Sequence, residues 1–283
     1  MVAISIALAS SVLWGISDFL GGLKSRSFAV PVVLACTYLA SLTVMALFVA
    51  GRGEGPPGSE AIFTGLAAGL FGIAGLSAFY RALAIGTMSI VAPIASTGVA
   101  LPVLVGLATG DQPGLLRSLG LAAAVVGVAL ASREDDAAIA DARLQRQSIV
   151  LAVVAGLGFG TYFVLAEIAS RDDVAWALLL SRIAATPLVL AFAIVALRRG
   201  GRRPRGRDLA VLVVIGLLDL AANLAYNIST TLGELSTVAV ASSLYPVTTV
   251  LMAAALLGER VRGIQRVGVV VALFGVVLIS AGA

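Results

Sequence analysis

The chain has 283 residues, 60% of them hydrophobic and 12% charged, and its mean hydropathy of +1.06 lies far above the range of soluble domains. It contains no histidine and one cysteine, Cys36, which excludes histidine-ligated haem, HExxH zinc hydrolases and Ser–His proteases. Its one lysine, Lys24, lies at the end of an apolar segment, which excludes a retinal Schiff base. The sequence therefore predicts an integral membrane protein with no catalytic residues, no metal site and no cofactor.

Apolar runs bounded by charges, glycines and prolines predict ten membrane-spanning helices, because about 20 helical residues cross a bilayer. The expected spans are 3–22, 29–50, 61–83, 88–109, 115–132, 147–167, 174–197, 208–230, 236–257 and 263–281. The apolar N-terminus lacks the positive region and cleavage site of a signal peptide, so we expect a retained first span. The fold class is thus an all-α, multi-pass protein of the cell (inner) membrane, with one membrane domain over residues 1–283.

The two halves of the chain match each other at nearly constant offsets, which indicates an internal repeat. The matched positions include Gly15, Ser25 and Arg26 with Gly160, Ser170 and Arg171; Gly86, Ser89 and Ser96 with Gly233, Ser236 and Ser243; and Gly110, Asp111 and Gly120 with Gly258, Glu259 and Gly268. Repeat one is expected over residues 1–132, a polar connecting segment over 133–146 and repeat two over 147–283. Because each copy has an odd number of spans, the repeats are predicted to be inverted in the membrane.

Most of the 18 arginines lie in connections that follow odd-numbered spans, including the segment LRRGGRRPRGRD at 197–208. The positive-inside rule places these connections in the cytoplasm and both termini outside. Arginines in such short connections are expected to meet lipid headgroups rather than nucleic acid.

The eighth expected span carries a polar stripe. Asp219, Asn223, Tyr226, Asn227 and Thr230 follow one another at helical spacing and share one face. A carboxylate in mid-membrane costs roughly 2.5 to 3.5 kcal/mol, so this face is expected to meet protein or water rather than lipid. The amides and hydroxyls alone are equally compatible with a polar seam between helices. The carboxylate of Asp219 favours the wall of a substrate pathway.

Prolines are expected to interrupt three spans: Pro93 and Pro102 the fourth, Pro187 the seventh and Pro246 the ninth. Interrupted membrane helices usually line protein or a cavity, because their freed backbone groups need new partners. The glycines of the third span predict a small-residue face for close helix packing. The GDQP and GERV turns, which contain Asp111 and Glu259, are interpreted as helix ends with an acid in the headgroup region.

Several motifs resemble the EamA-type branch of the drug/metabolite transporter superfamily. They are WGISDF at 14–19, FGTYFV at 159–164, AFYRALAIGTMSIVAPIAS at 78–96, AYNISTTLGELSTVAVASSLYP at 225–246, and GE followed by Q-R-x-G-x(6)-G at 258–275. The resemblance implies ten spans, alternating access of the two halves, and a central cavity lined by spans one, three, four, six, eight and nine. Two positions differ between the copies: Thr37 stands at the place of Arg182, and Gly98 at the place of Pro246.

Polar and aromatic residues within the expected spans cluster on the same set of spans. The predicted substrate-binding residues are Trp14, Ser17, Tyr80, Ser96, Thr97, Tyr162, Asp219, Asn223, Tyr226, Asn227, Ser243 and Tyr245. Asp18 belongs to the same polar cluster. Spans five and ten consist almost entirely of small and aliphatic residues, and are interpreted as scaffold or as a dimer face, so the protein is expected to be a monomer or a homodimer.

The leading hypothesis is a secondary active transporter that exports a small polar metabolite such as an amino acid. No nucleotide-binding segment is present, so protons or the gradient of the substrate are expected to supply the energy. The alternatives are a translocase for lipids or lipid-linked sugars, an intramembrane enzyme with Asp219 or Glu167 as acid or base, and a sensor. No nucleophile–base pair supports the enzyme.

Asp219 and Arg182 enter the membrane from opposite faces and reach similar depths, about ten and eight residues into their spans. An ion pair between them is therefore geometrically possible. Either the two charges only neutralise each other, as buried charges usually do, or Asp219 is released in one access state to bind a proton or an ammonium group and couples transport to it.

Overall fold

A computed structural model describes residues 1–111, 114–131, 142–259 and 263–281, and these residues form helices and short connections without a strand. The helices are α1 (Val2–Ser25), α2 (Val30–Arg52), α3 (Ser59–Ile85), α4 (Met88–Ser96), the 3-10 turn η1 (Thr97–Val99), α5 (Ala100–Thr109), α6 (Leu115–Ala131), α7 (Ala142–Ser170), α8 (Val174–Arg198), α9 (Arg207–Leu232), α10 (Leu235–Ser242), α11 (Tyr245–Leu257) and α12 (Gly263–Ala281). The predicted all-α class is confirmed for the described residues.

In the described part of the chain, eight segments are long and apolar enough to cross a membrane. They are α1, α2, α3, α4 to α5, α7, α8, α9 and α10 to α11. Large apolar side chains such as Leu47, Phe63 and Phe192 are more than half exposed on their outer faces, which lipid would cover. The chain is therefore a multi-pass integral membrane protein. The helices α6 and α12 overlap the other two expected spans, and the number ten stays a prediction.

Two of the three spans expected to be interrupted are interrupted, although α4 continues through Pro93 and the break follows it. The segment that begins with α4 passes through η1 around Gly98 before α5 continues, and the segment that begins with α10 breaks at Ser243 before α11. Pro246 lies in the first turn of α11. A backbone N–H at that position has no acceptor within the helix, so proline costs no hydrogen bond there. The expected interruption at Pro187 is wrong, because α8 continues through it as one helix. Loss of a single backbone hydrogen bond is tolerated there.

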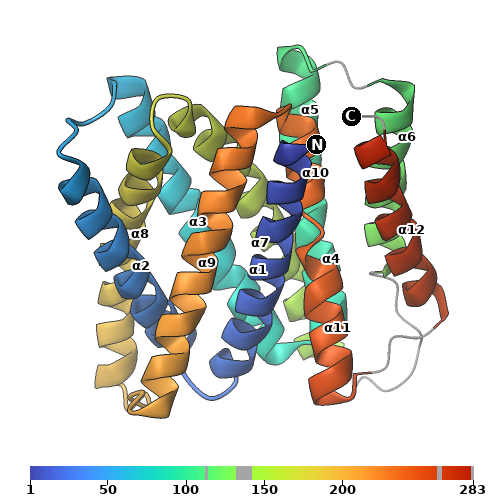
Figure 1. Ribbon diagram of the computed structural model, residues 1–283. Coiled ribbons are helices and arrows are strands. Elements are labelled where there is room, and N and C mark those ends of the chain that lie inside the picture. The colour runs from blue at the N-terminus through green and yellow to red at the C-terminus, as the bar shows by residue number, and fades with distance from the viewer. Residues whose placement is uncertain (112–113, 132–141, 260–262, 282–283) are drawn as a thin grey trace.

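Figure 1 shows the helices as an upright bundle, with α2 and α8 at one edge and α6 packed on α12 at the other. Between the edges, α1 packs on α9 and α3 packs on α7. The close contact of η1 with α7 depends on glycine, since a Cβ atom at Gly98 would collide with the backbone carbonyl of Gly156. Small residues at such crossings allow backbones to approach closely in membrane bundles.

Asp111 and Glu259 cap helices that lie far away in the sequence. The Asp111 carboxylate accepts a hydrogen bond of 2.9 Å from the backbone N–H of Ser236, at the start of α10. The Glu259 carboxylate accepts bonds from the backbone N–H and the hydroxyl of Ser89, at 3.2 and 2.9 Å, at the start of α4. Both acids follow a glycine with positive φ, Gly110 or Gly258, which ends the preceding helix. They are helix ends, as expected, and they also connect the two halves of the chain.

Candidate functional site

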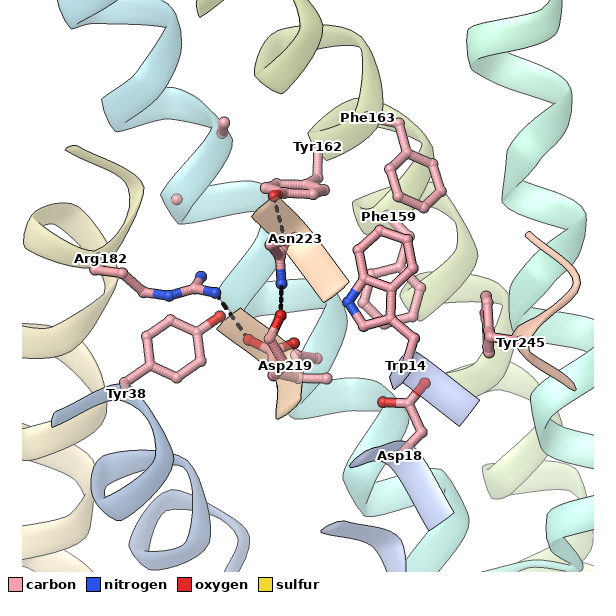
Figure 2. Close-up of a pocket in the computed structure, with 14 residues that line it drawn as sticks. Trp14, Asp18, Tyr38, Phe159, Tyr162, Phe163, Arg182, Asp219, Asn223 and Tyr245 are labelled. Carbon is pink, nitrogen blue, oxygen red and sulfur yellow. Dashed lines mark hydrogen bonds and ion pairs between the residues drawn. The ribbon is translucent and has the colours of Figure 1, made fainter. Parts of the chain in front are cut away.

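A cavity lies in the middle of the bundle, where α1, α2, α3, α7, α8, α9 and α11 meet (Figure 2). Its lining residues are Trp14, Asp18, Tyr38, Ala68, Gly69, Gly72, Leu76, Phe159, Tyr162, Phe163, Arg182, Asp219, Asn223 and Tyr245. The volume is about 50 Å³, which is room for roughly three or four water molecules. Charged, aromatic and small side chains from both halves of the sequence therefore line one cavity.

Arg182 and Asp219 form an ion pair on one side of this cavity. Nη2 of Arg182 donates to Oδ2 of Asp219 at 2.8 Å, and the side chains are only 3% and 14% exposed. The guanidinium also lies over the ring of Tyr38, at 4.7 Å from its centroid, which adds a cation–π contact. Nε of Arg182 is buried without a hydrogen-bond partner among the described residues. The ion pair that the sequence made possible is thus present, and one donor of its cation has no partner in the described part of the chain.

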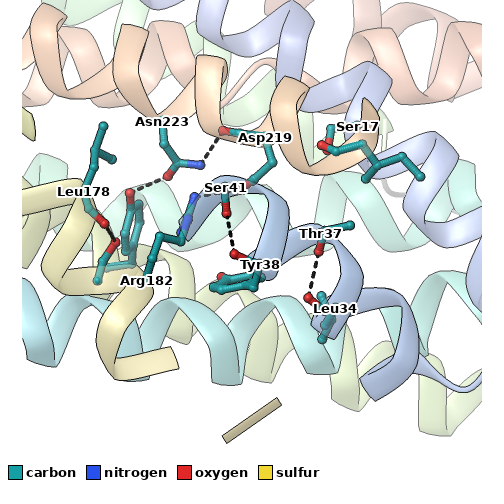
Figure 3. Close-up of polar contacts among 12 residues, drawn as sticks. Ser17, Leu34, Thr37, Tyr38, Ser41, Leu178, Arg182, Asp219 and Asn223 are labelled. Carbon is teal, nitrogen blue, oxygen red and sulfur yellow. Dashed lines mark hydrogen bonds and ion pairs between the residues drawn. The ribbon is translucent and has the colours of Figure 1, made fainter. Parts of the chain in front are cut away.

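A short chain of hydrogen bonds fixes the neighbouring residues of the α9 stripe (Figure 3). The amide Nδ2 of Asn223 donates to the backbone carbonyl of Asp219 at 2.6 Å, and the Tyr162 hydroxyl donates to Oδ1 of Asn223. Both groups of the amide are therefore committed. This arrangement holds Asp219, Asn223 and the Tyr162 ring on the same wall of the cavity.

Aromatic rings form the opposite wall. The Trp14 ring lies 5.5 Å from that of Phe163 and 5.7 Å from that of Tyr226, and Phe163 and Tyr226 are 4.8 Å apart. Such offset contacts lock large side chains in place and exclude water. Tyr245, from the first turn of α11, adds a hydroxyl that is buried and has no hydrogen-bond partner among the described residues. The wall is thus rigid and apolar, with one polar atom left unsatisfied.

Asp18 lies one helical turn after Trp14 on α1 and also lines the cavity. Asp18 is 6% exposed. Its carboxylate makes no hydrogen bond or ion pair with any residue that the structure describes. In Figure 2 the carboxylate lies beside Trp14, away from Arg182. A buried acid without a partner is costly, and such groups concentrate at functional sites.

The cavity contains five of the predicted substrate-binding residues, namely Trp14, Tyr162, Asp219, Asn223 and Tyr245, together with Arg182 of the predicted ion pair. Of the other seven, Thr97 is exposed and the rest are buried, and five of the seven donate hydrogen bonds to backbone carbonyls. Ser17 donates to the carbonyl of Ile215, Ser96 to Pro93, Thr97 to Ile94, Tyr226 to Phe163 and Ser243 to Val240. Tyr80 packs against Gly21, and Asn227 is buried without lining the cavity. A substrate contact at these seven positions stays a prediction.

Several lining residues escaped the sequence analysis. Gly69 and Gly72 were interpreted only as packing residues, yet they also line the cavity. A Cβ at Gly69 would collide with the backbone of Ser181, and one at Gly72 would come within 3.0 Å of the Tyr162 ring. Tyr38 and Phe159 were missed because a single aromatic residue in an apolar span does not distinguish a cavity-lining position from a packing position. Tyr38 directly follows Thr37, the repeat counterpart of Arg182, and that adjacency was the available clue.

Outside the spans, Asp173 forms a separate cluster at one end of the bundle. Its carboxylate accepts hydrogen bonds from Arg52, at 3.0 and 2.7 Å, and from the backbone N–H of Trp176 in the first turn of α8. Partial burial raises the pKa of Asp173, but these hydrogen bonds outweigh it and hold the pKa below its ordinary value. The cluster fixes the start of α8, the helix that carries Arg182.

Comparisons with known proteins agree with this architecture. The model of the EamA-like transporter family matches two stretches of the chain, residues 1–133 and 146–281. No curated protein matches it. A solved crystal structure, described only as that of a protein, has a TM-score of 0.72 over 99% of this chain and 99% of its own, at 18% sequence identity. At that identity the likeness shows a shared fold.

Proposed function

The chain belongs to the EamA-like transporter family, and on that premise we propose that it is a secondary active transporter that exports a small polar metabolite. The observation that carries this proposal is the central cavity, which is lined by an ion pair, an unpartnered carboxylate and an aromatic wall. Small-molecule sites are typically concave and mostly apolar, with a few convergent polar groups.

Transport requires that this cavity open to each side in turn. At about 50 Å³ it is too small for an amino acid, so loading needs the helices around it to separate. We propose that ten spans in two inverted repeats move against each other around the cavity. Two features support this: the broken helices α4 and α10 begin at opposite ends of the bundle (Figure 1), and each receives its cap from the other half.

The expected partners are a small-molecule substrate and the lipid bilayer, with protons or the substrate gradient as the energy source. The edge helices α6 and α12 pack on each other away from the cavity, which suits the roles of scaffold or dimer face.

Counterflow in proteoliposomes tests the proposal. Vesicles loaded with an unlabelled metabolite panel should take up a labelled member of the panel, and the uptake should saturate. Replacement Asn223→Ala removes the amide that holds Tyr162 and Asp219 on the cavity wall and should slow exchange by about five-fold or more, since each such hydrogen bond contributes about 1 kcal/mol. The matched variant Leu217→Ala changes the exposed face of the same helix and should exchange normally. Absence of saturable exchange across the panel would contradict transport.

The inverted arrangement has its own test. Arg26 and Arg171 are repeat counterparts with side chains 35% and 63% exposed, so single cysteines at these positions should be accessible. In a Cys36→Ser background, Arg26→Cys and Arg171→Cys should react with an impermeant maleimide from opposite sides of the membrane. Reaction of both from the same side would exclude inverted repeats while leaving transport itself untouched.

A further inference from the structure

We propose that Asp18 binds the positively charged group of the substrate, and that the transported species is a monocation whose ammonium group competes with a proton for this carboxylate. The inference rests on the proposed transport function and specifies the substrate class of the same cavity.

The first step is the charge balance of the cavity. Its charged lining residues are Asp18, Arg182 and Asp219. Arg182 and Asp219 neutralise each other at 2.8 Å, which leaves one negative charge, on Asp18. A buried carboxylate without a partner is strongly unfavourable, so this charge requires either a proton or a cation. A monocation neutralises the site, whereas a zwitterion leaves the net charge of the site unchanged.

The second step is what surrounds Asp18. Its helix α1 packs against α2, α3, α9, α10 and α11. The titratable groups that act on Asp18 or are acted on by it are Asp219 of α9, Tyr80 of α3 and Tyr245 of α11, and these are acids or phenols. On α2 the nearest candidate, Tyr38, lies under Arg182, and α10 contains no titratable residue. Among the described residues, no cation of the protein is therefore placed to neutralise Asp18.

The third step is the kind of cation that fits. Trp14 lies one turn before Asp18, and in Figure 2 its side chain begins next to the Asp18 carboxylate, with the indole extending from there into the middle of the cavity. The faces of aromatic rings attract ammonium groups once water is excluded. The unpartnered hydroxyl of Tyr245 supplies a further acceptor for an ammonium N–H. A carboxylate, ring faces and a free hydroxyl suit an organic ammonium group better than a small, strongly hydrated metal cation.

Binding of a charge series tests this directly. Trp14 and Trp176 are the two tryptophans of the chain, so Trp176→Phe leaves Trp14 as a reporter in the cavity wall. The purified full chain is titrated with butylammonium, norvaline and valerate, whose net charges are +1, 0 and −1. Butylammonium should change Trp14 fluorescence saturably and bind at least about ten-fold more tightly than norvaline, and valerate should not bind.

Proton competition gives a second readout. Butylammonium keeps its charge below pH values of about 10, so any loss of affinity on acidification reports on the protein. Affinity should fall towards about ten-fold per pH unit once Asp18 is protonated, and cation binding should release a proton into weakly buffered solution. Asp18→Asn should bind butylammonium at least about ten-fold more weakly and without pH dependence, whereas Asp18→Glu should retain pH dependence.

The matched control is Glu167→Gln. Glu167 is an acid in a membrane helix that pairs with Arg171 at 2.8 Å and lies outside the cavity, so this variant should bind as the unmodified protein does. Equal or stronger binding of norvaline, no binding of butylammonium, or unchanged pH dependence in Asp18→Asn would each overturn the inference. If Asp18→Asn does not fold, the charge series and the pH dependence of the unmodified protein decide alone.

The two proposals fail differently. Saturable, pH-dependent binding of butylammonium without any counterflow would contradict the proposed transport function and support the cation site. Counterflow of zwitterions that butylammonium does not inhibit would retain transport and exclude the cation site.

Discussion

At the two ends of the bundle, each half of the chain caps a helix of the other half in the same way. In the middle, the two halves carry different side chains at equivalent positions. Asp111 caps α10 at one end, and Glu259 caps α4 at the other. These acids are counterparts in the repeat, and so are the serines that they cap. In the middle, the counterpart of Arg182 is Thr37, and that of Asp219 is Gly72.

The difference separates structural positions from chemical ones. Gly72 and Asp219 both line the cavity, from α3 and α9, so the repeat maintains the geometry of the wall while one copy supplies the charge. Leu76 and Asn223 form a second pair of this kind. A cavity between two identical halves would carry every charge twice. Here divergence leaves one cation and two acids, which is the imbalance that makes Asp18 available to a ligand.

The largest expected effect is in the middle. Arg182→Gln leaves Asp219 buried without its cation, and breaking such a pair typically costs about 3 to 5 kcal/mol. The double variant Arg182→Gln with Asp219→Asn removes both charges and should recover most of the Tm measured in detergent. Arg171→Gln is the matched control, because that guanidinium belongs to an exposed ion pair worth about 1 kcal/mol or less. If the Tm of Arg182→Gln equals that of the control, the buried ion pair with Asp219 contributes no more to stability than an exposed pair does.

The same double variant distinguishes the two candidate coupling acids. If Asp219 couples transport to protons, the double variant should exchange substrate without responding to a pH gradient. If Asp18 does so, the response to a pH gradient should survive in the double variant and be lost in Asp18→Asn. Uptake into proteoliposomes with and without an imposed pH gradient measures both. A response that persists in Asp18→Asn and disappears in the double variant would restore Asp219 as the coupling residue.

An intermediate effect is expected at the ends. Helix caps contribute about 0.5 to 2 kcal/mol, so Asp111→Ala and Glu259→Ala should each lower the Tm moderately. Glu259→Ala should cost more, because Glu259 also accepts from the Ser89 hydroxyl and lies 3.8 Å from Arg26. The Ser236 hydroxyl, by contrast, is buried without a partner among the described residues. A larger loss for Asp111→Ala would reverse this ranking of the two ends.

The helices were largely predictable because lipid and water impose strong rules on sequence. Apolar runs bounded by charges located each expected span within a few residues of a helix, and prolines indicated two of the interrupted spans, whose breaks lie near Gly98 and Pro246. Pro187 misled because proline removes only one donor, and a well-packed helix tolerates that loss. The capping roles of Asp111 and Glu259 were hidden, because the helix that each caps lies more than a hundred residues away in sequence.

The site was predictable only where polarity marked it. Asp219 and Asn223 stood out in an apolar span, and helical spacing placed them on one wall. The same spacing also suggested Tyr226 and Asn227, but the Tyr226 hydroxyl donates to the carbonyl of Phe163 on α7, and neither residue lines the cavity. Gly69 and Tyr38 contribute by shape, and shape depends on the helix opposite, which no local pattern reports.

The smallest expected effect is at Asp173, where the carboxylate is accessible to solvent and its partner Arg52 lies at the end of α2. Hydrogen bonds hold the folded-state pKa of Asp173 below its ordinary 3.8, so its contribution to stability is complete above about that pH and is lost as the pH falls through the folded value. Asp173→Asn should therefore lower the Tm slightly at neutral pH, and the difference from the unmodified protein should vanish in acid. High salt should also reduce it, because exposed pairs are screened, whereas the cost of Arg182→Gln in the buried middle should persist. Asp172→Asn is the matched control, since it removes the same charge from the same turn but makes no ion pair among the described residues. A Tm difference for Asp173→Asn that is independent of both pH and salt would contradict a stabilising role for the charge of Asp173, because asparagine can keep the helix cap.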